Sequence, residues 1–95
     1  MLHFQKLSDS EALKSHRLIQ LEKMLRRKRL RFYALKSRLA ILAAIRSRFP
    51  EESTDYVRRV SENLLEQATT YGEIASCQGG IRWIQRAIEI IEGSD

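Results

Sequence analysis

Residues Ser8–Phe49 read SDSEALKSHRLIQLEKMLRRKRLRFYALKSRLAILAAIRSRF. This stretch contains no Gly and no Pro, and it is rich in Leu, Ala, Lys, Arg and Glu, which are good helix formers. Pro50 follows directly and disfavours helical dihedral angles at Phe49. The stretch therefore predicts one helix over 8–49, about 40 residues and about 60 Å long.

The apolar residues of this helix recur every seven positions. Two neighbouring lines form the seam, Leu18, Leu25, Phe32 and Leu39 on one and Leu21, Leu35, Leu42 and Phe49 on the other. Only Lys28 and Arg46 interrupt these lines. Such a narrow seam is typical of a helix that packs against other helices in a coiled coil.

The remaining residues predict two shorter helices, over 50–76 and 81–92. Pro50 is tolerated in a first helical turn. Gly79 and Gly80 cost roughly 2 kcal/mol inside a helix, so we expect a break between the two helices there. The residues expected to be buried are Val57, Val60, Leu64, Ala68, Tyr71 and Ala75 in the second helix and Ile81, Ile84, Ile88 and Ile91 in the third.

These elements predict an all-α fold, a single helical domain over 1–95 with an extended N-terminal segment over 1–7. The helices after Pro50 are together as long as the first helix, so we expect a long antiparallel hairpin. A chain of 95 residues buries a small core, and its only cysteine, Cys77, excludes an intramolecular disulfide. Dimerisation of two hairpins into a four-helix bundle, or a helical partner protein, would cover the open sides.

The residues predicted to form this self-association or partner seam are apolar and lie on the expected helix faces. Trp83 is included because tryptophans often anchor interfaces, although core packing explains it equally well. The set comprises Leu18, Leu21, Leu25, Phe32, Leu35, Leu39, Leu42, Phe49, Trp83, Ile84 and Ile88.

Charge is distributed unevenly along the chain, whose formal net charge is +5. Between Lys14 and Arg48 there are twelve basic residues and one acid, Glu22, whereas eight acids and four arginines lie between Glu51 and Glu92. The simplest interpretation is that the two arms of the hairpin neutralise each other.

A hairpin folded about Pro50 places the densest basic run opposite residues 69–75, which contain Glu73 as their one acid. The run therefore predicts a surface for an anionic partner: nucleic acid contacted through its phosphates, or an acidic protein. An anionic membrane ranks last, because the apolar seam is narrow. The predicted contact residues are Arg26, Arg27, Lys28, Arg29 and Arg31.

No catalytic, metal or cofactor site and no small-molecule substrate is predicted. His3 and His16 have no partner at a metal-ligand spacing, and Cys77 has no histidine near it in the sequence. Gly79-Gly80 lacks the Lys-Ser/Thr of a phosphate loop.

No apolar run approaches the roughly 20 residues that span a bilayer, and the first seven residues lack the apolar core of a signal peptide. The expected location is therefore cytoplasmic. The predicted function is a non-enzymatic assembly or adaptor protein that packs its helices against a copy of itself or another protein and carries a basic patch. The alternative is a nucleic-acid-associated protein that binds the phosphate backbone through Arg26–Arg31.

Overall fold

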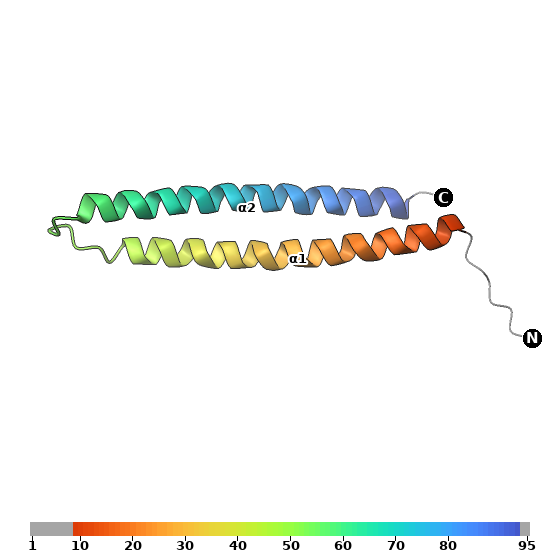
Figure 1. Cartoon of the computed structure of the whole chain (residues 1–95), viewed down its shortest axis with the longest axis horizontal. Coiled ribbons are helices and arrows are strands. Elements are labelled where there is room, and N and C mark those ends of the chain that lie inside the picture. The colour runs from red at the N-terminus through yellow and green to blue at the C-terminus, as the bar shows by residue number, and fades with distance from the viewer. Residues whose placement is uncertain (1–8, 94–95) are drawn as a thin grey trace, which may run out of the picture.

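Two long helices lie side by side and antiparallel in the computed structural model (Figure 1), which describes residues 9–93. Helix α1 spans Asp9–Arg46 and helix α2 spans Tyr56–Glu92. Every regular element within 9–93 is a helix, so the predicted all-α class and the hairpin are confirmed. The extended segment predicted for 1–7 and the expected helix start at Ser8 lie outside the described residues.

Helix α1 is continuous over 38 residues, as its composition predicts. It ends at Arg46, three residues before Phe49, and the chain continues in turns, in which the Arg48 amide donates to the Ile45 carbonyl and the Phe49 amide to that of Arg46. A last turn closed by such short-range bonds is a common end for a helix followed by proline.

The connection over 47–55 is longer than a tight turn at Pro50, and the second helix begins at Tyr56 rather than at Pro50. Backbone amides of Ser53 and Tyr56 close two successive turns by donating to the carbonyls of Pro50 and Ser53. The expectation that Pro50 opens the second helix is wrong, because Ser53 and Asp55 form a hydrogen-bonded turn that precedes it.

Helix α2 passes through Gly79 and Gly80 without a break, so the predicted third helix over 81–92 is the C-terminal part of α2. Neither glycine has a positive φ angle. The two glycines lower the helix propensity locally, but α2 is 37 residues long, and the turns that follow them pack against α1 through Ile81 and Ile84. Packing of this kind outweighs local helix propensity.

The seam of α1 faces a matching seam of α2, in which half-buried or buried residues alternate every three and four positions. Leu35 of α1 and Cys77 and Ile84 of α2 are the buried hydrophobic residues within 9–93. The positions of α2 on the seam are Tyr56, Val60, Asn63, Gln67, Thr70, Ile74, Cys77, Ile81, Ile84, Ile88 and Ile91. This three-four spacing on both helices is that of an antiparallel coiled coil.

The register differs by four residues from that of a turn centred on Pro50. Arg31 pairs with Glu73, and Arg38 with Glu66, whereas the symmetric turn would place residues 69 and 62 at these points. The longer connection accounts for the shift, because its middle lies after Pro50. The four-helix bundle formed by two hairpins stays a prediction.

Candidate interaction surfaces

The predicted partner seam lies between α1 and α2. Leu35 and Ile84 are buried, and the other aliphatic and phenylalanine members of the set are half-buried. Trp83 is the exception, with 68% of its surface exposed, so it does not pack in the core of the hairpin. Contact between these residues and a second protein is not tested by the hairpin and stays a prediction.

Two ion pairs line one side of this seam. The Arg31 guanidinium lies 3.1 Å from the Glu73 carboxylate, and that of Arg38 lies 3.9 Å from Glu66. All four side chains are more than a third exposed, so each pair contributes little to stability in water. The two pairs instead mark the register of the helices, because they show which residues face each other on this side of the seam.

The N-terminal half of α2 presents polar residues to α1, which the sequence analysis missed. Asn63 is buried, and its side-chain amide donates to the backbone carbonyl of Leu42, 2.9 Å away. Gln67 donates to the Asn63 amide oxygen at 2.6 Å. The Thr70 hydroxyl is satisfied within α2 by the Glu66 carbonyl. The seven-residue spacing of Asn63, Thr70 and Cys77 is the signal that would have identified this face.

The residues expected to be buried in this half of α2 are instead largely on its outer side. Val57, Leu64 and Tyr71 are 75%, 41% and 60% exposed, and Ala68 and Ala75 are exposed as well. Only Val60 of the predicted set is half-buried. The prediction followed hydrophobicity, whereas α1 packs against the neighbouring, more polar stripe. We call Val57, Leu64, Ala68, Tyr71 and Ala75 the outer stripe.

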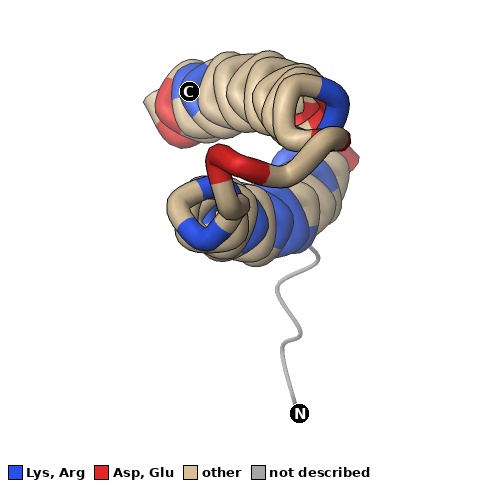
Figure 2. The backbone as a smooth tube through the Cα atoms, turned by 90° about the vertical axis from the view of Figure 1, so that its left-hand side faces the viewer, with Lys and Arg blue, Asp and Glu red and all other residues tan. Residues whose placement is uncertain are grey.

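The predicted basic run does not form a single surface. Arg26, Arg27 and Arg29 are exposed, and within 9–93 they make no hydrogen bond or ion pair with another side chain. Arg31 is paired with Glu73. Lys28 is a half-buried seam residue, and its Cε lies 3.4 Å from where a Cβ on Gly80 would stand. Bands of basic residues mark α1 in Figure 2, whereas α2 shows few.

Two exposed apolar residues accompany these arginines. Leu30 and Tyr33 are 66% and 65% exposed, and they follow Arg26 at the four- and seven-residue spacing that keeps residues on one helix face. Phe32 contacts Tyr33 edge to face and lies under the Lys36 ammonium, 5.3 Å from the ring centre. Tyr33 is thus available to a partner, whereas Phe32 belongs to the seam.

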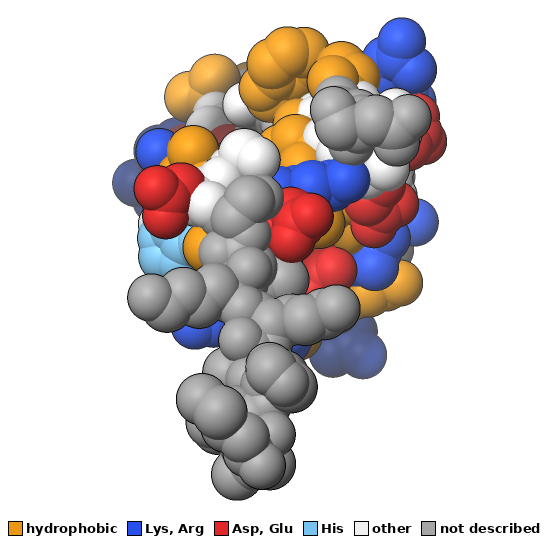
Figure 3. Space-filling view, turned by 90° about the vertical axis from the view of Figure 1, so that its right-hand side faces the viewer, with side chains coloured by type: hydrophobic (Ala, Val, Ile, Leu, Met, Phe, Trp, Pro, Cys, Tyr) orange, Lys and Arg blue, Asp and Glu red, His pale blue; other side chains and the backbone are white. Residues whose placement is uncertain are grey.

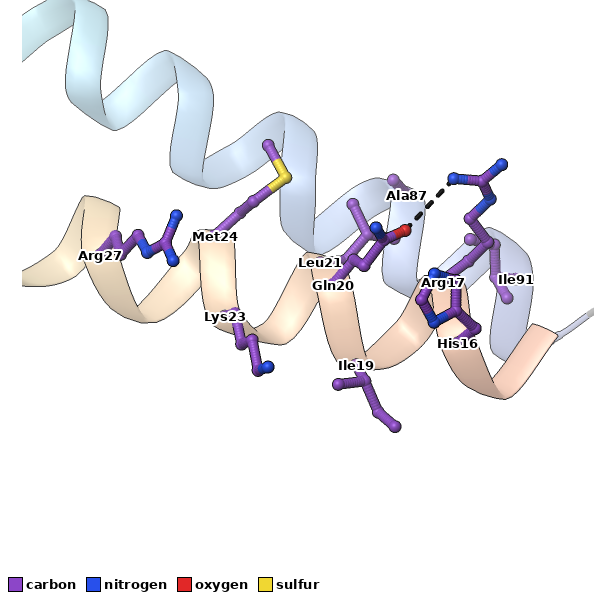
Figure 4. A pocket seen from close by; sticks show the side chains of 10 residues that line it. All are labelled: His16, Arg17, Ile19, Gln20, Leu21, Lys23, Met24, Arg27, Ala87 and Ile91. Carbon is purple, nitrogen blue, oxygen red and sulfur yellow. Dashed lines mark hydrogen bonds between the residues drawn. The ribbon is translucent and has the colours of Figure 1, made fainter. Parts of the chain in front are cut away.

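A shallow groove of about 730 Å³ lies where the two helix ends meet. In Figure 4, Met24 reaches toward α2, whereas Ile19 and Lys23 point away from it. Arg17 donates to the Gln20 amide oxygen at 3.2 Å. The side chains that line the groove do not point toward a common centre, as they would in a ligand site. We therefore interpret the groove as the open end of the coiled coil.

Reactive groups are not gathered at any point of the described chain. Within 9–93 no three His, Cys, Asp or Glu residues are placed to hold a metal ion. The Cys77 thiol is buried and donates to the Lys28 carbonyl. Neither α1 nor α2 has the length of apolar sequence that a membrane-crossing helix requires. No protein-family model, no curated protein and no solved structure gives a significant match to the chain.

Proposed function

We propose that this chain is a non-enzymatic assembly or adaptor protein that packs its helices against another protein, either a copy of itself or a different one. The supporting observation is an excess of exposed over buried hydrophobic side chains. Thirteen large hydrophobic residues within 9–93 are exposed, whereas three hydrophobic residues are buried. Figure 3, viewed from the open end, shows hydrophobic side chains on the outer surface on the side of α2. Exposed apolar surface of this extent is typical of interaction sites.

The magnitude of the effect favours a stable complex. Burying one Val, Leu or Ile side chain contributes about 1.5 to 3 kcal/mol. A partner that covers four such residues therefore contributes roughly 6 to 12 kcal/mol toward offsetting the cost of association, which is about 4 to 15 kcal/mol. The hairpin alone buries three hydrophobic residues and leaves the other apolar residues of its seam half-buried.

Photo-cross-linking in the native cell tests this proposal. A photoreactive residue at Val57 or Trp83, both exposed and apolar, is expected to capture one protein in stoichiometric amount. The same residue at Glu62 or Arg82, which are exposed and charged, serves as the control. A chain that captures nothing at the apolar positions and purifies as a stable, well-folded monomer contradicts the proposal.

Nucleic-acid binding is the second candidate, and the unpaired arginines of α1 favour it. Arg26, Arg27 and Arg29 are exposed and have no acidic partner within 9–93. Tyr33 lies seven residues after Arg26 on the same face of the helix, and its exposed ring is available for stacking on bases. Such a surface contacts phosphates and reads little sequence.

Binding to duplex DNA and to single-stranded RNA, titrated with salt, tests this candidate. Changing Arg26, Arg27, Arg29 and Arg31 to Gln is expected to abolish the affinity and to flatten its salt dependence. Changing the α2 arginines Arg58, Arg59, Arg82 and Arg86 to Gln lowers the formal charge by the same four units and is expected to leave binding intact. An affinity equal in both variants rules the candidate out.

A further inference from the structure

The outer stripe of α2 is arranged as an interface. Val57, Leu64 and Tyr71 follow one another at seven-residue intervals, and Ala68 and Ala75 follow Leu64 and Tyr71 four residues later. This spacing places all five on one face of the helix, one or two turns apart. All five are exposed in the hairpin.

This half of α2 is therefore inverted with respect to α1, the one helix that packs against it within 9–93. Its polar residues Asn63, Gln67 and Thr70 face α1, and the apolar residues of the outer stripe face solvent, although Val60 and Ile74 are half-buried in the seam. A helix packed on one side normally buries its apolar stripe and exposes its polar one. The inversion is removed if a second helix packs on the outer stripe, because this part of α2 then lies in the interior of a bundle.

Charge and side-chain size select the side on which that helix packs. The ion pairs Arg31–Glu73 and Arg38–Glu66 occupy one flank of the hairpin. Glu66 and Glu73 each directly precede a seam residue of α2, whereas Leu64 and Tyr71 each directly follow one. The outer stripe therefore lies toward the other flank. On that flank α1 contributes Ala40 and Ala43, which are exposed and small enough for a close approach, and the exposed Lys36, whose ammonium lies over the Phe32 ring.

We infer that the outer stripe is the contact for a second copy of this chain, with the two α2 helices packed antiparallel about a twofold axis at Ala68; the inference rests on the proposed function and names its partner. Leu64 and Tyr71 lie on either side of Ala68, so each packs near the other residue of the second copy. Ala68 meets Ala68 where the helices are closest. An interface of this kind uses the same surface on both copies.

The distribution of charge favours self-association through α2. The stripe is uncharged, and so are two further residues of the same face, Ser61 within the stripe and Gln78 just beyond Ala75. Two copies therefore meet there without repulsion. Contact through α1 would oppose two helices that each carry eleven Lys and Arg against three Asp and Glu. Like charges held face to face are destabilising.

The exposed area is large enough for such a contact. The accessible surface is 7934 Å² for 11.1 kDa. A compact monomer of this mass exposes about 5,650 Å². Even if the ten residues outside 9–93 are assigned the exposure of an unfolded chain, about 1,700 Å², the hairpin exposes about 1,000 Å² more than a compact monomer of its size. A stable interface buries about 800 Å² on each partner.

The mass of the purified chain in solution tests the inference. The wild type is expected at twice 11.1 kDa. Ala68→Arg places two cations at the twofold axis and is expected to halve the mass with unchanged helix content by circular dichroism. Thr69→Arg adds the same charge at the next exposed position, which points away from the stripe, and is expected to remain dimeric.

A cross-link tests the same geometry without depending on the stability of the Arg variant. In a Cys77→Ala background, Ala68→Cys is expected to form a disulfide-linked dimer on mild oxidation, and Thr69→Cys is not. The inference is overturned if the wild type is monomeric, or if the two positions behave alike in both assays. A monomer that still captures another protein through Val57 leaves the proposed function standing and removes the second copy as its partner.

Discussion

The Cys77 thiol of α2 donates a hydrogen bond to the backbone carbonyl of Lys28 in α1, with the sulfur 3.1 Å from the oxygen. Cys77 is 3% exposed, so this contact lies in the seam rather than on its edge. Three residues further along α2, the Lys28 side chain passes over Gly80. Lys28 thus occupies a seam position of α1 because α2 has small residues opposite it, Cys77 at its backbone and Gly80 at its side chain.

Replacement of Cys77 by Ala is expected to lower the free energy of unfolding by about 1 kcal/mol. The change removes a buried sulfur and leaves a small cavity, and it also removes a weak donor. Urea unfolding followed by circular dichroism measures the loss. Ser76→Ala, at an exposed neighbouring position, is the control and is expected to have no effect. An unchanged midpoint for Cys77→Ala would show that the seam is not closely packed at this point.

Replacement of Gly79 and Gly80 by Ala is expected to stabilise the hairpin by about 0.5 to 1 kcal/mol for each position. Both residues lie inside α2 with negative φ angles, where Ala is the better helix former. A Cβ on Gly79 meets no atom within 4 Å, and one on Gly80 meets Lys28 Cε at 3.4 Å, an ordinary contact distance. The thermal midpoint measures the gain. Lower midpoints would indicate that the helix needs to bend here.

Asn63→Leu is expected to stabilise the hairpin by about 1 kcal/mol and to reduce the uniqueness of its register. A buried Asn in a coiled-coil seam selects one register at the expense of stability. Here it does so by donating to Leu42 of α1. Thermal unfolding measures the first effect, and the mass distribution in solution measures the second.

Thr70→Val is the matched control for this change. Thr70 is as buried as Asn63, but its hydroxyl bonds within α2 and reaches no group of α1. The Val variant is therefore expected to keep a single register. If both variants broaden the mass distribution, the single register would depend on a buried polar side chain in the seam and not on the hydrogen bond from Asn63 to α1.

The sequence predicted α1 well and α2 less well, for physical reasons that differ between the helices. The seam from Leu18 to Leu42 is apolar except at Lys28, so periodicity identifies it directly. Along α2, Asn63 and Thr70 hold seam positions while Leu64 and Tyr71 lie outside, and hydrophobicity selects the wrong stripe. Which of two stripes faces α1 is decided by packing of the whole hairpin. Hydrophobicity alone does not contain that information.

The same limit explains the errors at Pro50 and at Gly79-Gly80. Proline indicates that α1 ends, but the start of α2 is set by hydrogen bonds among Ser53, Asp55 and Arg59. Glycine propensity is a local cost that packing over a long helix overrides. The sequence also does not show which arginine of the basic run is paired. Arg31 pairs with Glu73 because the length of the loop sets the register of the two helices.

The turn before α2 predicts a pH dependence of stability. A hydrogen bond from the Ser53 hydroxyl, together with the neighbouring Arg59 and Arg58 guanidinium groups, holds the pKa of Asp55 below its ordinary value of 3.8 despite partial desolvation. Because the folded-state pKa is the lower one, the stabilisation by this carboxylate is fully present above the unfolded-state value. It is lost as the pH falls through the folded-state pKa.

Asp55→Asn removes this dependence, so the thermal midpoints of the wild type and the variant are expected to differ at neutral pH, to approach each other below pH 3.8, and to meet only below the lower, folded-state pKa. Glu51→Gln removes a loop carboxylate that makes no hydrogen bond or ion pair within 9–93 and serves as the control. Its midpoint is expected to follow that of the wild type at every pH. Equal midpoints of wild type and Asp55→Asn at neutral pH would contradict this prediction and show that the turn stabilises α2 through the shape of residue 55, since Asn keeps that shape but loses the charge and the oxygen that accepts from Arg59.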